Sequence, residues 1–469
     1  MKKWISSLLA ICLIVSLTAC NSSTDTAEEA GNQTQSESNV QETMPPADES
    51  ELPDEQLDGF IQTASIAETV MVDENGVRIT ATGLNYTNYS VELALTIENN
   101  SGKDLSFISG SLGYSCNSIN GYMVSEGYLN CDVADGKKAN ETISFSYSGL
   151  MLYGIDEIAD IEIGFDISDE DYNHTYSGPR QVRTSAFDGY DYSEDRYQNA
   201  ITDRATMNAY GYDITHFSQE NLYNVNDITL LSSGVMVNQD GETSLLLELE
   251  NRTEDMVYLS TSDIALNGLV VSSSTWSSTA INPGKRCIIV VELSSVLAPE
   301  HWSIYGINEV GSVALSLNQL DPNGNYIAEE RSIEIMVPGV DTGYDATGEE
   351  VYRNNGLRIV AKTILEDSSE YSSDMYVLLL AENTSGRTLT IDDTYDSLSV
   401  NGYMTDYSFY SAELADGESA ALEIRLQESS LEENQIASVS DISEIEVGFE
   451  IKADRDIIDE PTVLIQFDS

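Results

Sequence analysis

Side chains that could perform acid–base or nucleophilic chemistry do not fall into a known catalytic spacing in this sequence. The histidines are His174, His216 and His301, and none belongs to an H-x-x-x-H or H-E-x-x-H pair of the kind that holds zinc. A G-x-S-x-G nucleophile elbow is not present either. We therefore predict no catalytic residue, no metal site and no enzymatic activity.

Carboxylates are the most abundant reactive groups, with 80 Asp and Glu residues in 469. Among so many, some pair must lie by chance at the separation that glycoside hydrolases use, so abundance alone does not indicate acid–base catalysis. A carbohydrate-active hydrolase with paired carboxylates is the alternative from a different functional class.

Three acidic loops have the oxygen donors that Ca²⁺ prefers. They are residues 166–171, the stretch from Asp321 to Asn325, and the group Asp392, Asp393 and Asp396. The second loop begins like an EF-hand but lacks the glycine at its sixth position and the glutamate at its twelfth. No cofactor is predicted; Ca²⁺ is the one that the sequence allows, and a solvated turn is the simpler interpretation.

Tyrosine is in excess, with 26 residues against 9 Phe and 3 Trp. Tyr forms strands well and can lie half-buried with its hydroxyl in water, which is a structural explanation. The functional alternative is recognition of a glycan or a protein, because rigid amphipathic rings often anchor such partners. The candidate ligand-binding residues cluster in one stretch, near Trp276 and Trp302 in sequence: Tyr190, Tyr192, Tyr197, Tyr210, Tyr212 and Tyr223.

The N-terminus has the parts of a secretory signal. Lys2 and Lys3 precede an apolar run at 4–17, and residues 17–20 are Leu-Thr-Ala-Cys. These four residues resemble the bacterial lipobox, which implies that Cys20 receives a diacylglyceryl thioether and becomes the mature N-terminus. We therefore expect a lipoprotein held at the extracellular face of the cell membrane by fatty acyl chains such as palmitate, since two chains suffice for stable anchoring.

The other cysteines do not form a disulfide framework. Cys12 lies in the signal, Cys287 stands apart, and Cys116 and Cys131 fall in one predicted domain. Export permits a disulfide between Cys116 and Cys131, but without a C-x-x-C spacing the sequence leaves that bond open.

The formal charge of −59 argues against nucleic acid as a partner, because affinity for phosphate backbones comes largely from Lys and Arg. The charge is already visible in residues 21–58, which contain eleven acidic residues, no Lys or Arg and no aromatic residue. Such a segment cannot bury enough apolar surface to fold, so we predict a disordered acidic tether.

After Phe60 the chain changes to short alternating apolar runs separated by Asn-Gly, Asp-Gly and Pro-Gly, which predicts strands and hairpins. One pattern occurs three times: a strand ending in Glu-Asn, an Asn-Gly pair, a second tight turn and a closing strand. The Glu-Asn strands are 95–101, 247–253 and 379–385, the Asn-Gly pairs begin at 120, 267 and 401, the second turns are 135–136, 283–284 and 416–417, and the closing strands are 158–165, 310–317 and 442–449.

Two details of these units make local predictions. Both central residues of an Asn-Gly turn of type I′ need positive φ, and the alternation in the closing strands places Glu162 and Glu446 in water. Ser430-Leu-Glu-Glu433 predicts a capping box at the start of a single helical turn.

The Asn-Gly-Val-Arg-Ile of 75–79, the similar 355–359, and the Asn-Gly-Tyr-Met of 120–123 and 401–404 resemble the immunoglobulin-like, telokin-like domains of Gram-positive bacterial lipoproteins. The resemblance covers most of the first and third units. The second unit departs from it, with Leu269-Val270 in place of Tyr-Met and a Tyr-rich insertion. The family implies architecture and surface display and supplies no catalytic residues.

We therefore predict an all-β protein of three tandem immunoglobulin-like β-sandwich domains after a disordered N-terminal tether. The predicted segments are a signal peptide at 1–19, the lipidated cysteine and tether at 20–59, and sandwich domains at 60–187, 188–340 and 341–469. The predicted function is non-catalytic binding or adhesion to an unknown extracellular glycan or protein, with membrane contact through the lipid. A structural spacer at the cell surface is a further alternative.

Overall fold

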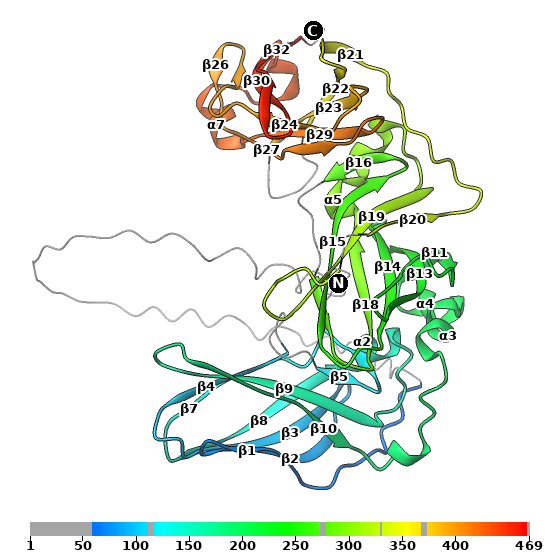
Figure 1. Ribbon diagram of the computed structural model, residues 1–469, viewed down its shortest axis with the longest axis vertical. Helices are drawn as coiled ribbons and strands as arrows, with labels where there is room; N and C mark the ends of the chain where they lie inside the picture. The colour runs from blue at the N-terminus through cyan, green and yellow to red at the C-terminus, as the bar shows by residue number, and fades with distance from the viewer. Residues whose placement is uncertain (1–58, 111–116, 273–277, 329–330, 367–372, 467–469) are drawn as a thin grey trace, which may run out of the picture. The chain divides into compact units, whose positions relative to one another are not determined.

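β-Strands make up most of the secondary structure in the computed structural model of the chain (Figure 1), which describes residues 59–110, 117–272, 278–328, 331–366 and 373–466. The predicted all-β class with sandwich domains is confirmed. In these residues, no helix is long and apolar enough to cross a membrane. The predicted signal peptide, Cys20 and the tether lie outside the described residues.

The first sandwich contains strands β1 to β10. One sheet has the order β1-β2-β3-β8, formed by β1 (Thr69–Glu74), β2 (Val77–Tyr86), β3 (Ser90–Asn99) and β8 (Lys137–Ser146). The facing strands are β4 (Leu105–Ser109), β5 (Ser118–Ile119), β6 (Tyr122–Met123), β7 (Leu129–Val133), β9 (Asp160–Asp169) and β10 (His174–Arg183). Helix α2 (Tyr147–Leu152) follows β8, with the Ser146 hydroxyl accepting from the Gly149 N–H as its cap.

Three short helices lead from the first sandwich into the second: η1 (Phe187–Gly189), α3 (Arg196–Thr202) and α4 (Arg204–Ala209). One sheet of the second sandwich is formed by β11 (Tyr212–Ser218), β12 (Asn224–Val225), β13 (Ile228–Asn238), β14 (Thr243–Asn251) and β18 (Arg286–Glu292). The other sheet is formed by β15 (Val257–Leu266), β16 (Leu269–Ser272), β17 (Ser278–Ile281), β19 (Ser312–Leu320) and β20 (Arg331–Met336). Between β18 and β19 lie α5 (Leu293–Val296), α6 (Pro299–Trp302) and η2 (Ser303–Tyr305).

The third sandwich repeats the plan of the first. Its first sheet is formed by β21 (Glu349–Asn354), β22 (Leu357–Glu366), β23 (Met375–Asn383), β27 (Tyr407–Phe409) and β29 (Ser419–Leu426). Its second sheet is formed by β24 (Leu389–Asp393), β25 (Ser399–Val400), β26 (Tyr403–Met404), β28 (Ala412–Leu414), β30 (Glu444–Ala453), β31 (Asp456–Asp459) and β32 (Thr462–Gln466). Helices α7 (Glu428–Glu433) and η3 (Val439–Asp441) precede β30.

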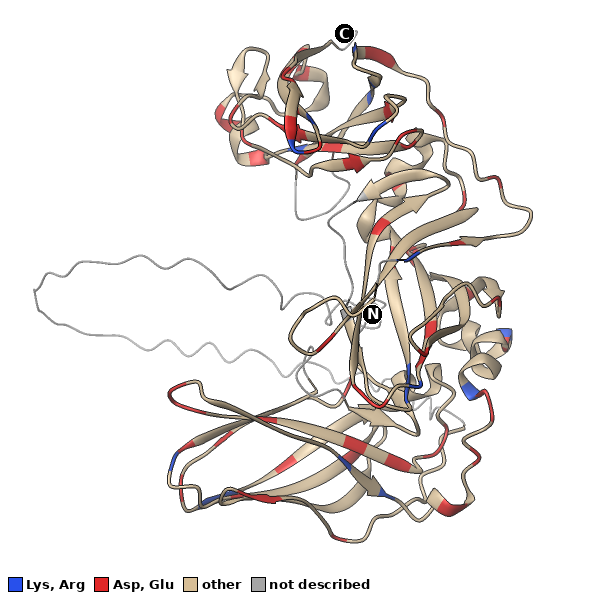
Figure 2. Cartoon of the chain, in the orientation of Figure 1, with Lys and Arg blue, Asp and Glu red and all other residues tan. Residues whose placement is uncertain are grey.

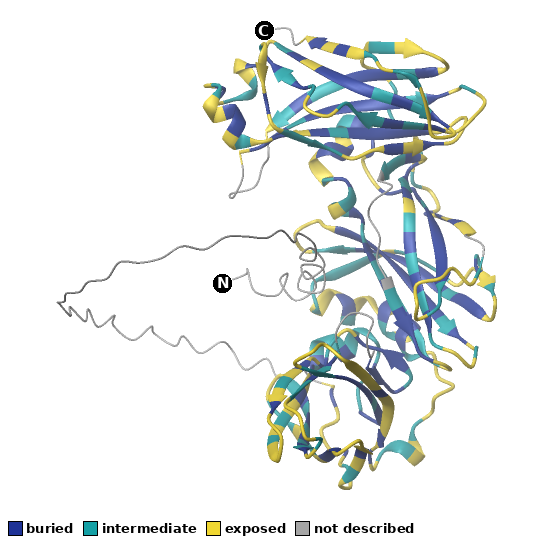
Figure 3. Cartoon of the chain, turned by 60° about the vertical axis from the view of Figure 1, so that its left-hand side comes forward, coloured by how far each residue is buried: buried dark blue, intermediate teal, exposed yellow. Residues whose placement is uncertain are grey.

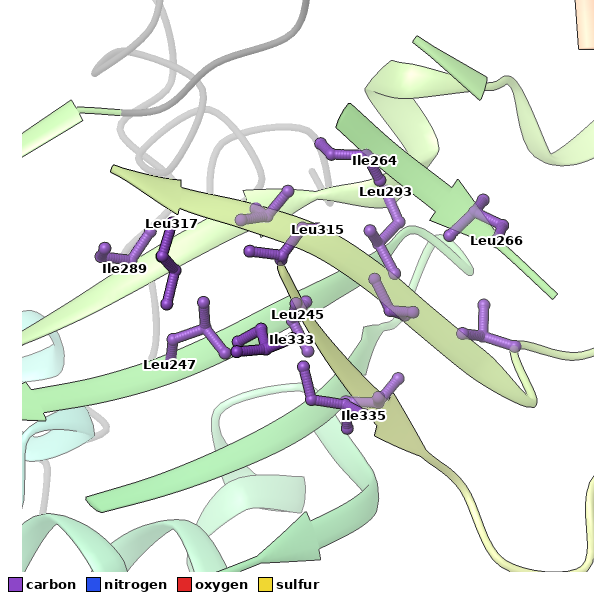
Figure 4. Close-up of a cluster of buried hydrophobic side chains, with 14 of the residues drawn as sticks. Leu245, Leu247, Ile264, Leu266, Ile289, Leu293, Leu315, Leu317, Ile333 and Ile335 are labelled. Atoms are coloured by element: carbon purple, nitrogen blue, oxygen red, sulfur yellow. The ribbon is translucent and has the colours of Figure 1, made fainter. Parts of the chain in front are cut away.

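Side-chain alternation along these strands builds the cores. In β3 every second residue is buried, as a two-residue period requires, and the same alternation is visible along many strands in Figure 3. The described residues form three hydrophobic clusters, one centred on each sandwich. In the second sandwich, residues from both sheets meet, among them Leu247 and Ile289 from one sheet and Leu315 and Ile335 from the other (Figure 4).

A buried asparagine at the end of each Glu-Asn strand connects the two sheets of its sandwich. Asn99 Nδ2 donates to the Val133 carbonyl at 2.7 Å, Asn251 Nδ2 to Ile281 at 2.8 Å, and Asn383 Nδ2 to Leu414 at 2.9 Å. Each Oδ1 accepts the backbone N–H two residues later. The side chains are fully buried, so these hydrogen bonds satisfy amides that would otherwise be costly to desolvate.

The Asn-Gly turns have the predicted backbone. Asn120, Asn267 and Asn401 have φ of 48°, 49° and 52°, and the glycines that follow also have positive φ. Each asparagine Oδ1 accepts backbone N–H groups at the start of the closing strand of the same sandwich. The repeated sequence pattern therefore corresponds to two repeated polar contacts, one at each end of the unit.

Two local predictions are wrong. Helix α7 begins at Glu428 after the N-cap Gln427, so Ser430 lies inside the helix, where its hydroxyl accepts from the Asp406 N–H at 2.9 Å. The capping box is instead at Ser438 and Asp441 of η3. Glu446 is exposed as predicted, but Glu162 is largely buried because Lys285 of the second sandwich pairs with it.

Candidate functional site

The Tyr-rich segment does not gather its rings on one surface. Tyr197 on α3 is buried, with its ring 6.5 Å from that of Tyr122 on β6, and Tyr122 in turn lies 6.1 Å from Tyr153. Burial raises the pKa of Tyr197 well above its ordinary value, because the phenolate would be desolvated there. Tyr197 therefore packs where the first and second sandwiches meet, and a ligand cannot reach it from solvent.

A buried carboxylate lies beneath α3 at the same joint. Glu248 on β14 is fully buried and accepts from Gln198 Nε2 at 2.7 Å, Ser232 Oγ at 2.8 Å and Arg286 Nη1 at 3.2 Å. Arg286 also pairs with Asp195 at 2.8 Å. Because buried charges need such partners, this cluster fixes α3 to the second sandwich and accounts for part of the segment without invoking a ligand.

Tyr190 and Tyr192 form a pair nearer the surface. Their rings meet edge to face with centroids 4.8 Å apart, and the Arg196 guanidinium lies 4.6 Å from the Tyr190 ring centroid. The Tyr192 hydroxyl donates to Asp160 Oδ1 at 2.6 Å, and burial followed by this hydrogen bond raises the pKa of Tyr192. This pair is the part of the predicted set that best keeps an accessible aromatic face, since Tyr192 is exposed.

Tyr210 and Tyr212 are half-buried between α4 and β11, and burial raises the pKa of both hydroxyls. A hollow of about 340 Å³ lies nearby. Neither tyrosine is among its lining residues, which are Ile201, Thr202, Arg204, Met207, Asp213, Ile214, Thr215 and Phe217.

Tyr223 is buried in the second sandwich, where its hydroxyl is hydrogen-bonded to Gln319. Gln319 Nε2 donates to the Tyr223 hydroxyl at 3.0 Å and to the Val225 carbonyl at 2.8 Å. These two bonds fix the amide orientation, because a carbonyl can only accept. Gln319 is itself buried, and its Oε1 has no hydrogen-bond partner within the described residues.

Gln319 lies in the wall of a hollow of about 270 Å³ on the second sandwich. The hollow is formed by the end of β19, the turn between β12 and β13, the loop after Asn251 and the loop 321–327. Both residues of the turn, Asn226 and Asp227, have positive φ, and Asn226 Nδ2 donates to the Ile327 carbonyl at 3.2 Å. The lining residues are Asn226, Thr253, Asp255, Met256, Val257, Gln319, Asp321, Pro322 and Ile327.

The chemistry of this hollow suits a small ligand that donates hydrogen bonds. A buried acceptor without a hydrogen-bond partner is costly, so a small rearrangement that opens Gln319 Oε1 to a hydroxyl or amino group in the hollow would give it the bond that the protein lacks. Asp255 presents an exposed carboxylate at the rim, and Met256 and Pro322 supply apolar surface. A few polar groups set among apolar ones are typical of ligand pockets.

The three acidic loops considered for Ca²⁺ use their carboxylates within the protein. Asp321 Oδ1 accepts the N–H groups of Asn323 and Asn325 at 2.8 and 2.9 Å, and hydrogen bonds from this loop lower its pKa. Asp166 contacts His174 at 3.0 Å, and Asp392 pairs with Lys452 at 3.1 Å. In the part of the chain that the structure describes, no three His, Cys, Asp or Glu residues gather as a metal site.

The remaining candidates are placed as follows. His301 is buried against Glu423 at 2.6 Å, and Trp302 is buried with its indole N–H donating to the Leu297 carbonyl at 2.7 Å. Cys131 carries a free thiol on β7, and burial raises its pKa to about 11. Cys116 and Trp276 lie outside the described residues.

Sequence analysis did not find Gln319 or the hollow. It noticed the Asp321 loop for its oxygen donors and Tyr223 for its ring; Asp321 lines the hollow together with Gln319, and the Tyr223 hydroxyl accepts from the Gln319 amide. A buried amide without a partner has no signature in the sequence, because the lack of a partner is a property of the packed structure.

Comparisons with known proteins do not indicate a function for this chain. No protein-family model and no curated protein matches the chain. Among solved structures, an exo-chitosanase of Amycolatopsis orientalis matches at 10% identity over 50% of this chain and 26% of its own, with a TM-score of 0.16. A solved chain from a structural study of a 1.5-MDa bacterial ice-binding adhesin matches at 11% identity over 80% of this chain and 90% of that solved chain, with a TM-score of 0.13.

Alpha-2-macroglobulin of Escherichia coli matches at 8% identity over 83% of this chain and 33% of its own, with a TM-score of 0.14. The chain spans about a quarter of the length of the chitosanase. Similarities with TM-scores this low carry no argument about function, so the proposal below depends on the residues of this chain.

Proposed function

We propose that this chain is a lipid-anchored protein of the outer cell surface that binds an extracellular ligand without catalysis. The observation that carries the binding proposal is the hollow beside Gln319, where a buried acceptor lacks a partner within the described residues. The anchoring proposal is supported by the Leu-Thr-Ala-Cys sequence that ends at Cys20. The expected ligand is a glycan or a protein segment that presents hydroxyl or amino donors.

Charge narrows the class of ligand. Acidic residues outnumber basic ones by 80 to 21, and Figure 2 shows them spread over the described strands and loops with few Lys or Arg among them. Such a surface repels anions, so nucleic acids and other polyanions are disfavoured, whereas neutral and amino-bearing sugars are not.

The binding proposal is tested by a glycan array and a pull-down with a chain that begins at residue 21. That chain carries no signal and retains all three hydrophobic clusters. Saturable binding is expected. Tyr192→Ala tells the two candidate surfaces apart: loss of binding would indicate an aromatic contact near α3, and unchanged binding would indicate the hollow. If the folded chain binds none of the glycans and surface proteins tested, the binding proposal is refuted.

Anchoring and catalysis have their own tests. Cys20→Ser is expected to release the protein into the medium, and unchanged membrane retention of that variant would contradict lipidation. The hydrolase alternative predicts turnover of a polysaccharide that a single carboxylate substitution abolishes. Turnover of that kind would overturn the non-catalytic proposal.

A second candidate, the structural spacer, is favoured by the way the sandwiches are joined. Strands β6 and β18 pair across the first joint, and β16 and β29 pair across the second. Hydrogen-bonded joints restrict motion between neighbouring sandwiches. A chain that binds nothing in the screens above but resists local opening at both joints would be assigned to this class.

A further inference from the structure

The joint between the first and second sandwiches inserts a short strand of one domain beside a strand of the next. β6, which follows the turn at Asn120-Gly121, runs parallel to β18 with Tyr122 opposite Arg286. The Arg286 N–H donates to the Gly121 carbonyl at 2.9 Å. Met123, only 5% exposed, belongs to the hydrophobic cluster of the second sandwich, not to that of its own.

The joint between the second and third sandwiches is built in the same way. β16, which follows the turn at Asn267-Gly268, runs parallel to β29, with Leu269 opposite Ser419 and Val270 opposite Ala420. Val270 packs against the hydrophobic cluster of the third sandwich. We call β6, β16 and β26 the insert strands, and β8, β18 and β29 the acceptor strands.

The register of the two joints is identical. We call the tight turn that precedes an acceptor strand the acceptor turn. In each joint, the first residue of the insert strand lies opposite the residue two positions after the glycine of that turn. This residue is Arg286, after Gly284, in the first joint and Ser419, after Gly417, in the second. Because both joints have the same geometry, we infer that each repeat unit has two complementary surfaces, its insert strand and its acceptor strand. Each sandwich then has an insert strand to offer and an acceptor strand to receive one.

The insert strand of the third sandwich has no acceptor in the described chain. β26 pairs only with β25 there, and Tyr403 and Met404 are 59% and 60% exposed. Their counterparts in the first sandwich, Tyr122 and Met123, are both buried. An exposed Tyr-Met pair at the tip of a hairpin is apolar surface of the kind that marks an interaction site.

The acceptor strand of the first sandwich is also open. β8 is an edge strand that pairs only with β3 among the described strands. Ala139 on β8 corresponds to Cys287 and Ala420, which are buried, whereas Ala139 is half-buried. An open strand edge presents unpaired backbone groups and is a template for pairing with another chain.

Charges at the two open ends match the first joint. There Lys285, directly after the acceptor turn, pairs with Glu162 on β9 at 2.6 Å. The corresponding residues at the open ends are Lys137 and Glu446. Glu446 lies opposite Ser399 just as Glu162 lies opposite Ser118, and both Lys137 and Glu446 are exposed.

We propose that a second copy of this chain supplies the missing partner, with β26 of one copy pairing in parallel with β8 of the next. Tyr403 would lie opposite Lys138, Met404 would cover Ala139, and Glu446 would pair with Lys137. The interface is head to tail, so it generates a ring if the rotation closes and a filament if it does not.

The proposal is tested by sedimentation velocity on the chain that begins at residue 21, over increasing concentration. Association is expected, with Met404→Ser and Glu446→Lys each weakening it by at least about tenfold, as loss of an interface anchor or of a paired charge does. Glu413→Lys, on the exposed face of β28, and Tyr395→Ser, at another exposed tyrosine, are the matched controls and should change nothing.

Charge reversal provides the decisive comparison. Lys137→Glu alone and Glu446→Lys alone are expected to impair association, whereas the double variant restores it because the two charges have exchanged places. These residues are exposed, so circular dichroism should show intact folding in all three. A chain that stays monomeric up to about 1 mM, or a double variant no better than the single ones, would overturn the proposal.

Cross-linking distinguishes head-to-tail contact from a symmetric dimer. Lys138→Cys and Tyr403→Cys are made in separate chains, and disulfides are allowed to form in each alone and in a mixture. The mixture is expected to yield a covalent heterodimer. A chain that carries both substitutions is expected to yield a ladder of covalent oligomers. Cross-linking of Tyr403→Cys with itself as efficiently as in the mixture would contradict the proposed pairing.

Discussion

Replacing Asn383 by Ala tests the buried asparagine that connects the two sheets of the third sandwich. Its Nδ2 donates to the carbonyls of Arg387 and Leu414 at 2.8 and 2.9 Å, and its Oδ1 accepts the Ser385 N–H at 2.9 Å. Each such bond contributes about 1 kcal/mol net, and the buried carbonyls would lose their donor, so the expected loss is about 2–4 kcal/mol in the free energy of unfolding.

The loss should be local to the third sandwich, so hydrogen exchange read by mass spectrometry is the suitable assay. Peptides from β23, β24 and β28 are expected to lose protection, while peptides from β3 in the first sandwich keep theirs. Asn354→Ala is the matched control, since Asn354 is exposed and its side chain makes two hydrogen bonds at the surface, donating to Asp459 at 2.7 Å and accepting the Asn355 N–H at 2.9 Å. Equal effects of the two substitutions would refute the reasoning.

Three further predictions concern charges. Arg286→Met should leave the Glu248 carboxylate buried beside fewer partners and cost about 3–5 kcal/mol, seen as faster hydrogen exchange in α3; unchanged exchange there would contradict the assigned role. Hydrogen bonds from Thr347 lower the pKa of Asp345 to about 2, so its contribution to stability is complete above its ordinary pKa and is lost as the pH falls toward 2. Asp345→Asn should therefore flatten the acid side of the stability profile, and identical profiles would contradict this. Because the Asp321 carboxylate already accepts N–H groups of its own loop, added Ca²⁺ should not raise the melting temperature, whereas a rise that EDTA reverses would restore the metal hypothesis.

The repeat could be predicted well from the sequence because the residues that define it act on the backbone close to them in the chain. A Glu-Asn strand end and an Asn-Gly turn are constrained by backbone conformation within a few residues, and the structure shows positive φ at all three Asn-Gly asparagines. Helix α7 shows the limit of local rules. Ser430 has the spacing of a cap, but its hydroxyl accepts from Asp406, far away in sequence, and the helix begins earlier.

The candidate site was predicted only in part, because contacts between sandwiches decide which side chains are accessible. Tyr197 and Tyr223 are indistinguishable from Tyr192 by sequence, yet the first two are buried by neighbouring elements and the third is exposed. Glu162 and Glu446 occupy equivalent positions in two copies of the repeat, and they differ because only Glu162 has a following sandwich packed against it in the described chain.

The central claim, that the second sandwich binds a hydrogen-bond-donating ligand in the hollow beside Gln319, is tested most directly by calorimetric titration of the ligand found in the screens. Asp255→Asn removes a rim charge whose side chain is exposed, so folding should be unaffected. We predict that affinity falls by roughly ten- to a hundredfold, as for a lost hydrogen bond to a charged group, and that Asp456→Asn, an exposed aspartate of the third sandwich, has no effect. Equal affinities for the wild type and Asp255→Asn would contradict the claim.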